Sequence, residues 1–205
     1  STPTTILGIV WMVRMIATAN EKGKSNEGER SHLLHPGLAD TISTLCRLTL
    51  QGKFYKKIGE QIFLIPVEDG ETVSILDYDV TFFDILSTKA KQFGFTMHLK
   101  NGKKFTCAGD EPYNPECKPY VEGSQWLLHE AFCLYGDRER FQPYEKHHST
   151  VKEACELAES LSFQICAVAT EDKNLSHRKE LYTAEGKEYY HGNLLVPDDG
   201  EIIKL

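Results

Sequence analysis

Residues 148–169 read HSTVKEACELAESLSFQICAVA and carry the strongest structural pattern in the chain. Small and apolar side chains recur every three or four positions over residues 150–161, which is the spacing of one face of an amphipathic helix. Thr150 and Glu153 have the spacing of a capping box, in which two side chains satisfy backbone N–H groups at a helix start. The apolar run at residues 163–169 predicts a buried strand. A helix leading directly into a buried strand is typical of layered α/β folds.

The middle of the chain is rich in strand-forming residues, and Asn101-Gly102 separates two of these runs. This dipeptide predicts a hairpin with a type I′ turn, because both central residues of that turn need a positive φ. Thr4 and Thr5 are expected to cap the first helix, and Gly52 to end the second. The expected helices cover residues 6–16, 38–50, 150–161 and 176–185, and the expected strands cover residues 61–67, 72–76, 80–85, 93–99, 103–108, 125–128, 163–169 and 193–196. A β-rich half followed by alternating strands and helices predicts layered sheets with helices outside.

Length and charge limit the classes of function. The 205 residues are expected to form a single domain over residues 1–205. The net charge of −7 argues against binding of duplex nucleic acid, because phosphate binding needs a basic surface. A small nucleotide or phosphodiester held by a few local groups remains possible.

Cysteine usage and hydropathy indicate the compartment. The six cysteines form no C-x-x-C pair, which favours reduced structural thiols. The apolar run at residues 6–17 is too short to cross a bilayer and carries Arg14. A cytoplasmic location without membrane contact is therefore expected.

Three stretches resemble the ribonuclease Z branch of the metallo-β-lactamase superfamily. Residues 106–112 read TCAGDEP, residues 127–132 read LLHEAF, and residues 148–150 read HST. The order and spacing of the three agree with those of the family. The resemblance implies an α/β fold, an αββα sandwich of metallo-β-lactamase type that lacks its first strands here.

The resemblance also assigns roles to particular residues. Asp110 stands at the position of an aspartate that bridges two metal ions, which the neighbouring motifs favour over a simple turn residue after Gly109. His148 matches a catalytic histidine and is the candidate proton donor to a leaving oxygen. Glu130 is a second candidate for catalysis, and a structural role in holding the adjacent loop is equally open. His147 is expected at the surface.

Most nitrogen donors of the family's metal site are replaced. On the simplest alignment, Thr2, Thr4 and Thr5 stand where histidine, aspartate and histidine are found. Leu86 and Ala169 occupy two further histidine positions. A catalytic zinc needs three protein ligands, and these side chains cannot replace imidazole. No cofactor is therefore expected; if a metal is bound, we expect zinc, or manganese or iron, at Asp110.

Two functions are left open by these residues. The first is a hydrolase homologue with a degraded metal site, weak or inactive, that binds a small ligand or a protein partner. The second is an active metal-dependent phosphodiester hydrolase that uses Asp110 and His148 with ligands from elsewhere or from a second subunit. A small phosphodiester or nucleotide-like molecule is the expected ligand.

The family's first strands, which precede the metal motif, are missing from this sequence. Unpaired strand edges are usually covered in native proteins. We therefore expect a homo-oligomer or a partner chain that completes the sheet, unless the chain is a fragment or the remaining strands rearrange.

Overall fold

The computed structural model describes residues 3–21, 30–34, 36–169 and 176–205. The contacts between residues divide the chain into two compact units, Ser1–Glu68 and Asp69–Leu205. Each unit has a hydrophobic core of its own. The single domain expected over residues 1–205 stays a prediction. No helix in the described part of the chain is both long and apolar enough to cross a membrane.

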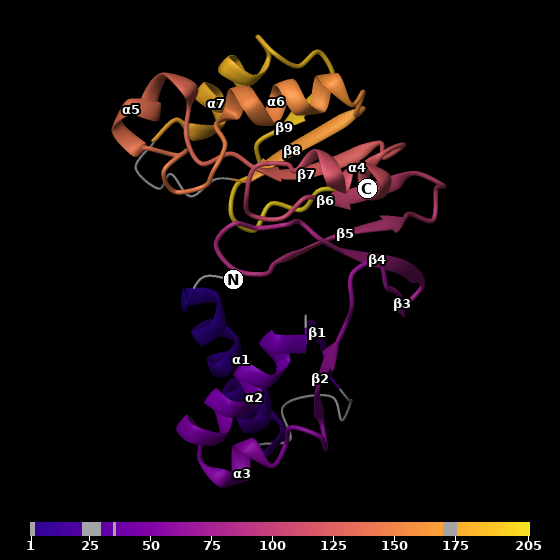
Figure 1. The fold of residues 1–205 in the computed structure, drawn as a ribbon, viewed down its shortest axis with the longest axis vertical. Helices are drawn as coiled ribbons and strands as arrows, with labels where there is room; N and C mark the ends of the chain where they lie inside the picture. The colour runs from indigo at the N-terminus through magenta and orange to yellow at the C-terminus, as the bar shows by residue number, and fades with distance from the viewer. Residues whose placement is uncertain (1–2, 22–29, 35, 170–175) are drawn as a thin grey trace. The chain divides into compact units, whose positions relative to one another are not determined.

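The smaller unit combines three helices with a two-stranded parallel sheet (Figure 1). Apolar side chains at helical spacing bury one face each of α1 and α2. Trp11, on α1, lies outside this core and is 56% exposed. The elements are α1 (Pro3–Glu21), β1 (Arg30–Leu34), α2 (Pro36–Thr49), α3 (Gly52–Tyr55) and β2 (Ile62–Pro66), and the buried core residues are Val10, Val13, Ile42, Cys46 and Ile62.

The first helix begins earlier than the sequence predicts. α1 begins at Pro3, so Thr4 and Thr5 lie inside its first turn, and the prediction that they cap it is wrong. Proline is favoured in a first turn because it lacks the N–H that would be unpaired there. α2 begins at Pro36 for the same reason. Gly52 follows α2 as expected, and it also starts α3.

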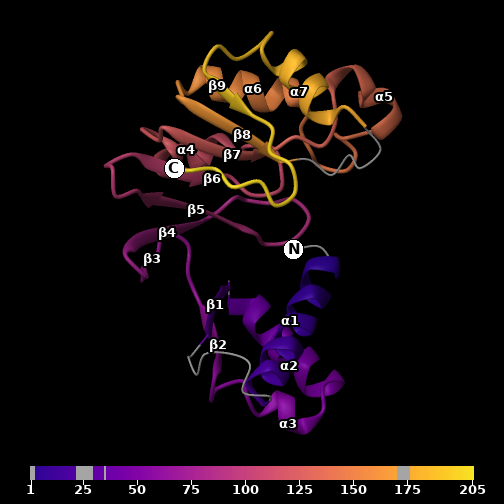
Figure 2. The ribbon, with the colours of Figure 1, turned by 180° about the vertical axis from the view of Figure 1, so that it is seen from behind.

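Seven strands form one mixed sheet in the larger unit, in the order β3-β4-β5-β6-β7-β8-β9. Neighbours from β3 to β6 are antiparallel, and neighbours from β6 to β9 are parallel. In both views α6 and α7 lie together against β7–β9 (Figures 1 and 2). The strands are β3 (Thr72–Ile75), β4 (Tyr78–Asp84), β5 (Phe93–His98), β6 (Lys104–Cys107), β7 (Trp126–Glu130), β8 (Ile165–Ala169) and β9 (Asn193–Leu195).

Among the described residues of this unit, two longer helices and four short ones connect the strands. The helices are η1 (Pro115–Cys117), α4 (Lys118–Val121), η2 (Tyr135–Asp137), α5 (Arg138–Phe141), α6 (Val151–Ser160) and α7 (Arg178–Gly186). One continuous core joins buried residues of α6 and α7 to those of the sheet. Trp126 of β7 is 6% exposed, and all six cysteines are free thiols. The predicted β-rich half followed by alternating strands and helices is confirmed.

The hairpin at Asn101-Gly102 is confirmed, but its turn is of a different type. Gly102 has a φ of +80°, whereas Asn101 does not have a positive φ, so the prediction of a type I′ turn is wrong. The side chain of Asn101 instead accepts a hydrogen bond from the Lys103 N–H at 3.0 Å. The Gly102 N–H donates to the Leu99 carbonyl at 2.9 Å and closes the turn.

The predicted capping box at the start of α6 is confirmed. The Thr150 N–H donates to Oε2 of Glu153 at 2.6 Å, and the Thr150 hydroxyl contacts the same oxygen. The first contact satisfies a backbone N–H at the start of the helix, and the Thr150 side chain accepts from the Glu153 N–H as the other half of the box.

We expect the Thr150 hydroxyl to stabilise the fold measurably. Thr150→Ala should lower the free energy of unfolding by about 1 kcal/mol relative to Thr150→Ser, because only serine retains the capping oxygen. Both variants lose the same methyl group, so serine is the matched control. Urea denaturation followed by circular dichroism measures the difference, and equal stability of the two variants would contradict this role of the hydroxyl.

Candidate functional site

Parallel strands bring three chain segments to one edge of the larger unit's sheet. β6, β7 and β8 run parallel, so their carboxyl ends lie at the same edge. Asp110 follows β6, while Glu130 ends β7 opposite Ala169, the last residue of β8. Gly109 has a φ of +88°, and a Cβ there would lie 2.8 Å from Cδ1 of Ile85. Glycine therefore allows the turn into Asp110 to pack closely on the end of β4.

Glu130 fixes the segment before α6 to the end of β7. Its Oε1 accepts hydrogen bonds from the N–H of Ser149 at 2.5 Å and from the Ser149 hydroxyl at 2.6 Å. The Phe132 N–H donates to the Ser149 carbonyl at 2.9 Å, which extends the connection along the backbone. Glu130 is only 6% exposed, so its charge depends on these donors. This geometry supports the structural role that the sequence left open for Glu130.

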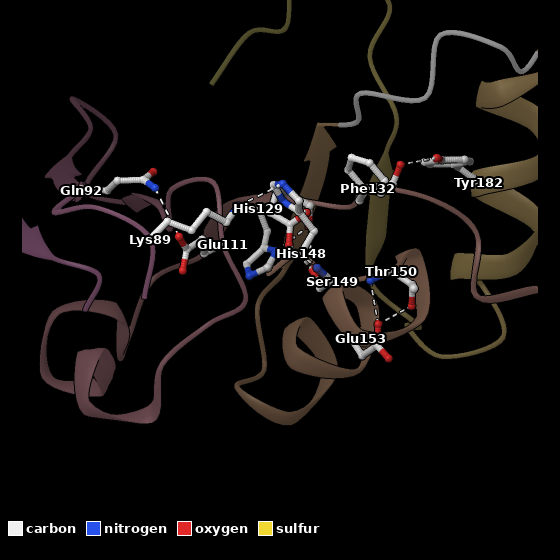
Figure 3. A network of polar contacts seen from close by, with 11 residues as sticks. Lys89, Gln92, Glu111, His129, Phe132, His148, Ser149, Thr150, Glu153 and Tyr182 are labelled. Carbon is white, nitrogen blue, oxygen red and sulfur yellow. Dashed lines mark hydrogen bonds and ion pairs between the residues drawn. The ribbon is translucent and has the colours of Figure 1, made fainter. Parts of the chain in front are cut away.

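His148 contacts a different group on each side of its ring. Its Nδ1 lies 3.4 Å from Oε2 of Glu130, and its Nε2 lies 3.2 Å from Nζ of Lys89 (Figure 3). The ring stacks on Phe132 with centroids 4.8 Å apart and planes 11° apart. His148 is 8% exposed, so these neighbours fix the orientation of its imidazole.

The pKa of Glu130 is lowered below its usual value. Burial alone would raise this pKa, but the contacts with His148, His129 and Ser149 favour the charged form and outweigh it. The Nδ1–H of His129 donates to the Glu130 carbonyl oxygen at 2.6 Å, while its buried Nε2 has no hydrogen-bond partner among the described residues.

A second buried carboxylate orders the loop after β4. Oε1 of Glu111 accepts from the Ser87 hydroxyl at 2.5 Å, and Oε2 accepts from the Thr88 N–H at 3.1 Å. The Gln92 amide also donates to Oε1, at 3.4 Å. The Thr88 hydroxyl lies 2.8 Å from Nδ1 of His147, so this loop contacts two neighbouring histidines, His147 through Thr88 and His148 through Lys89.

A pocket of about 320 Å³ lies beside these groups. Leu86 lies in its wall and is 43% exposed. Leu86 and His147 both have left-handed backbone conformations, with φ of +57° and +56°. Aromatic and apolar side chains dominate the wall, and the lining residues are Ile85, Leu86, Thr88, Glu111, Pro112, Tyr113, Asn114, Pro115, Tyr144, His147 and His148.

The structure brings some of the predicted site residues together. Glu130 and His148 are in contact, and His147 is exposed, as expected, at the pocket rim. Asp110 follows the neighbouring strand at the same sheet edge. Thr2 lies outside the described residues. The roles predicted for Asp110, Glu130 and His148 in metal binding or catalysis stay predictions.

Sequence reasoning missed the groups that surround His148. These groups are Thr88, Lys89 and Glu111. Their contacts join residues that are 19 to 59 positions apart in sequence, so no local pattern reveals them. The available signal was position alone, since Glu111 follows Asp110 directly and Lys89 follows the strand that ends before Leu86.

Removing the charge of Glu130 tests whether its carboxylate stabilises the fold. Its folded-state pKa lies below the unfolded value of about 4.3, so the carboxylate stabilises the fold above that pH. This stability is lost as pH falls through the folded-state pKa. Glu130→Gln should cost roughly 1–3 kcal/mol at pH 7, and the variant should lose less further stability than the wild type on acidification. Urea midpoints from about pH 6 to pH 3 measure both effects.

The exposed Glu156 of α6 provides the control. Glu156→Gln should follow the wild-type pH dependence. Parallel curves for the wild type and Glu130→Gln would show that Glu130 does not couple protons to folding.

No protein-family model matches the chain. Ribonuclease Z from Thermococcus sibiricus (strain DSM 12597 / MM 739) is 27% identical over 110 residues, which are 54% of this chain and 34% of that protein. The match thus spans about a third of the length of that relative.

Solved structures share the fold. The metallo-β-lactamase fold protein YhfI from Bacillus subtilis superposes with a TM-score of 0.68 at 14% identity, covering 97% of this chain and 71% of that chain. The short form of human tRNase Z gives a TM-score of 0.56 at 14% identity, covering 85% of this chain and 66% of that chain. The predicted α/β fold of metallo-β-lactamase type, a mixed sheet flanked by helices, is confirmed. The chain therefore has the metallo-β-lactamase type of fold and is similar in sequence to ribonuclease Z.

Proposed function

We propose that this ribonuclease Z homologue binds a small phosphodiester or nucleotide-like ligand beside His148 and does not hydrolyse it through bound metal ions. The observation that carries this proposal is the 3.2 Å contact between Nζ of Lys89 and Nε2 of His148. A protein cation therefore occupies Nε2, one of the two ring nitrogens through which His148 could bind a metal ion or transfer a proton.

The contact with Lys89 determines which ring nitrogen of His148 carries the proton. A lysine ammonium has three N–H donors and no acceptor, so Lys89 donates and Nε2 of His148 accepts. The proton of the neutral imidazole is then on Nδ1, which faces Oε2 of Glu130. A divalent cation at Nε2 would have to displace the ammonium from its acceptor and would be repelled by its charge.

The other side chains of the site do not fit the metal ions that the family resemblance implies. Within the described ranges, no three His, Cys, Asp or Glu side chains gather in an arrangement that could hold a metal ion. Leu86 presents only hydrocarbon to the pocket. Zinc and similar ions require several nitrogen, sulfur or oxygen donors.

The pocket favours a small molecule over a polymer. Its volume is near the lower end of the range for small-molecule sites, and its walls combine apolar and aromatic side chains with a few polar groups. The acidic chain, with a net charge of −7, lacks the general basic character of a protein that binds duplex nucleic acid.

Metal content is the direct test. Purified protein, incubated with Zn²⁺ or Mn²⁺ and desalted, should retain well under one equivalent by elemental analysis, together with negligible hydrolysis of bis(p-nitrophenyl) phosphate. An active ribonuclease Z prepared in parallel is the positive control. Two tightly bound equivalents with turnover would support the alternative, a hydrolase that uses Asp110 and His148, and the molar mass in solution would show whether a second subunit accompanies that activity.

Restoring two imidazoles should not restore hydrolysis. In the double variant Leu86→His with Ala169→His, we expect no gain in phosphodiesterase activity with added Zn²⁺ or Mn²⁺, because the positions of Thr2, Thr4 and Thr5 still lack donors. Robust turnover by the double variant would show that the alignment of residues 1–5 with the metal motif is wrong. Leu86→Asn with Ala169→Ser is the matched polar control.

A further inference from the structure

We propose that Lys89 is the anion receptor of this pocket, and that with His147 at the rim it binds the phosphate group of a small phosphate ester whose ring or apolar part fills the remaining volume. This inference rests on the proposed function and specifies its ligand. Lys89 is not one of the residues that line the pocket, but its ammonium contacts His148 and it follows Thr88 in sequence, and both of these residues do line the pocket (Figure 3).

The loop that carries Lys89 is anchored independently of its ammonium. Glu111 accepts from Ser87, from the Thr88 N–H and from Gln92, at 2.5, 3.1 and 3.4 Å. The Lys89 N–H donates to the Ser87 hydroxyl at 3.2 Å. Lys89 therefore extends from an ordered backbone, so its ammonium can exchange partners without loss of the loop structure.

The acidic groups around the pocket are already compensated. The carboxylate of Glu111 accepts from the loop, and that of Glu130 accepts from Ser149 and faces His148. Glu153 accepts from Tyr144 at 2.5 Å and from the N-terminus of α6. These contacts reduce the repulsion that an incoming anion would otherwise meet.

Lys89 differs from its neighbours in the charge of its partner. Its ammonium contacts a neutral imidazole nitrogen, whereas Nζ of Lys91, two residues later, lies 3.7 Å from Oδ2 of Asp84. Exchange of a neutral acceptor for a phosphate oxygen would give Lys89 a charge-assisted hydrogen bond, which is stronger. Lys91 has no equivalent gain, because a carboxylate already faces it.

His147 provides a second donor at the rim. The Thr88 hydroxyl lies 2.8 Å from its Nδ1. When that hydroxyl donates, the neutral ring carries its proton on Nε2, which can then donate to a ligand oxygen. Tyr113, Tyr144 and the prolines at positions 112 and 115 provide aromatic and apolar surface for the remainder of the ligand.

The test compares four probes by isothermal titration calorimetry: 5′-AMP, adenosine, glucose 6-phosphate and inorganic phosphate. Wild-type protein should bind AMP more tightly than adenosine, which lacks the phosphate. It should also bind AMP more tightly than glucose 6-phosphate, whose polar sugar ring offers no flat apolar surface to Tyr113 and Tyr144. Lys89→Met should weaken AMP binding at least about tenfold, which is the effect of losing one hydrogen bond to a charged group. Lys91→Met, in the same loop, should bind within about twofold of wild type.

Two further measurements keep the test decisive. Lys89→Arg preserves the charge and should retain most of the affinity, and nuclear magnetic resonance spectra of the variants show that the fold is intact. AMP recovered unchanged after incubation separates binding from hydrolysis. Undiminished AMP binding by Lys89→Met, or equal binding of adenosine and AMP, would overturn the role of Lys89 but would leave the proposed function standing. Failure of wild-type protein to bind any phosphate probe would overturn both this inference and the proposed function.

Discussion

The carboxylate of Glu130 is almost fully buried at the end of β7, and a buried charge without partners would cost several kcal/mol. The chain meets this constraint with the N–H and hydroxyl of Ser149 and with the imidazole of His148. These partners attach the start of α6 to the sheet and place His148 at the edge where the parallel strands end. The buried charge thereby helps to position His148, which in turn contacts Lys89 and lines the pocket.

Sequence reasoning predicted most of the fold because most elements carry a local signal. The apolar spacing of residues 150–161, the capping box and the buried strand after them all appear in the structure. The sequence predictions fail where an element depends on a contact between residues far apart in sequence, or where a turn can be closed by more than one backbone geometry. β1 has no alternating apolar pattern and exists through its pairing with β2, and Asn101 turns the chain through its side chain.

The site was predictable only in part. The resemblance to ribonuclease Z singled out Glu130 and His148, and the structure places them in contact, whereas composition and spacing alone would not have paired them. Lys89 and Glu111 were missed because tertiary contacts, not neighbours in sequence, give them their environment. The leucine at position 86, in place of a family histidine, was visible in the sequence. The contact between the Lys89 ammonium and the imidazole of His148 was not.

The two tryptophans of the chain fall in different units, with Trp11 largely in solvent and Trp126 buried in the sheet. An indole in water emits at longer wavelengths than one in an apolar interior, so the native emission spectrum contains two separable components. The short-wavelength component reports on the sheet that carries the pocket, and its loss marks the opening of that unit. The chain thus contains a built-in optical means of asking whether its two units unfold together or one after the other.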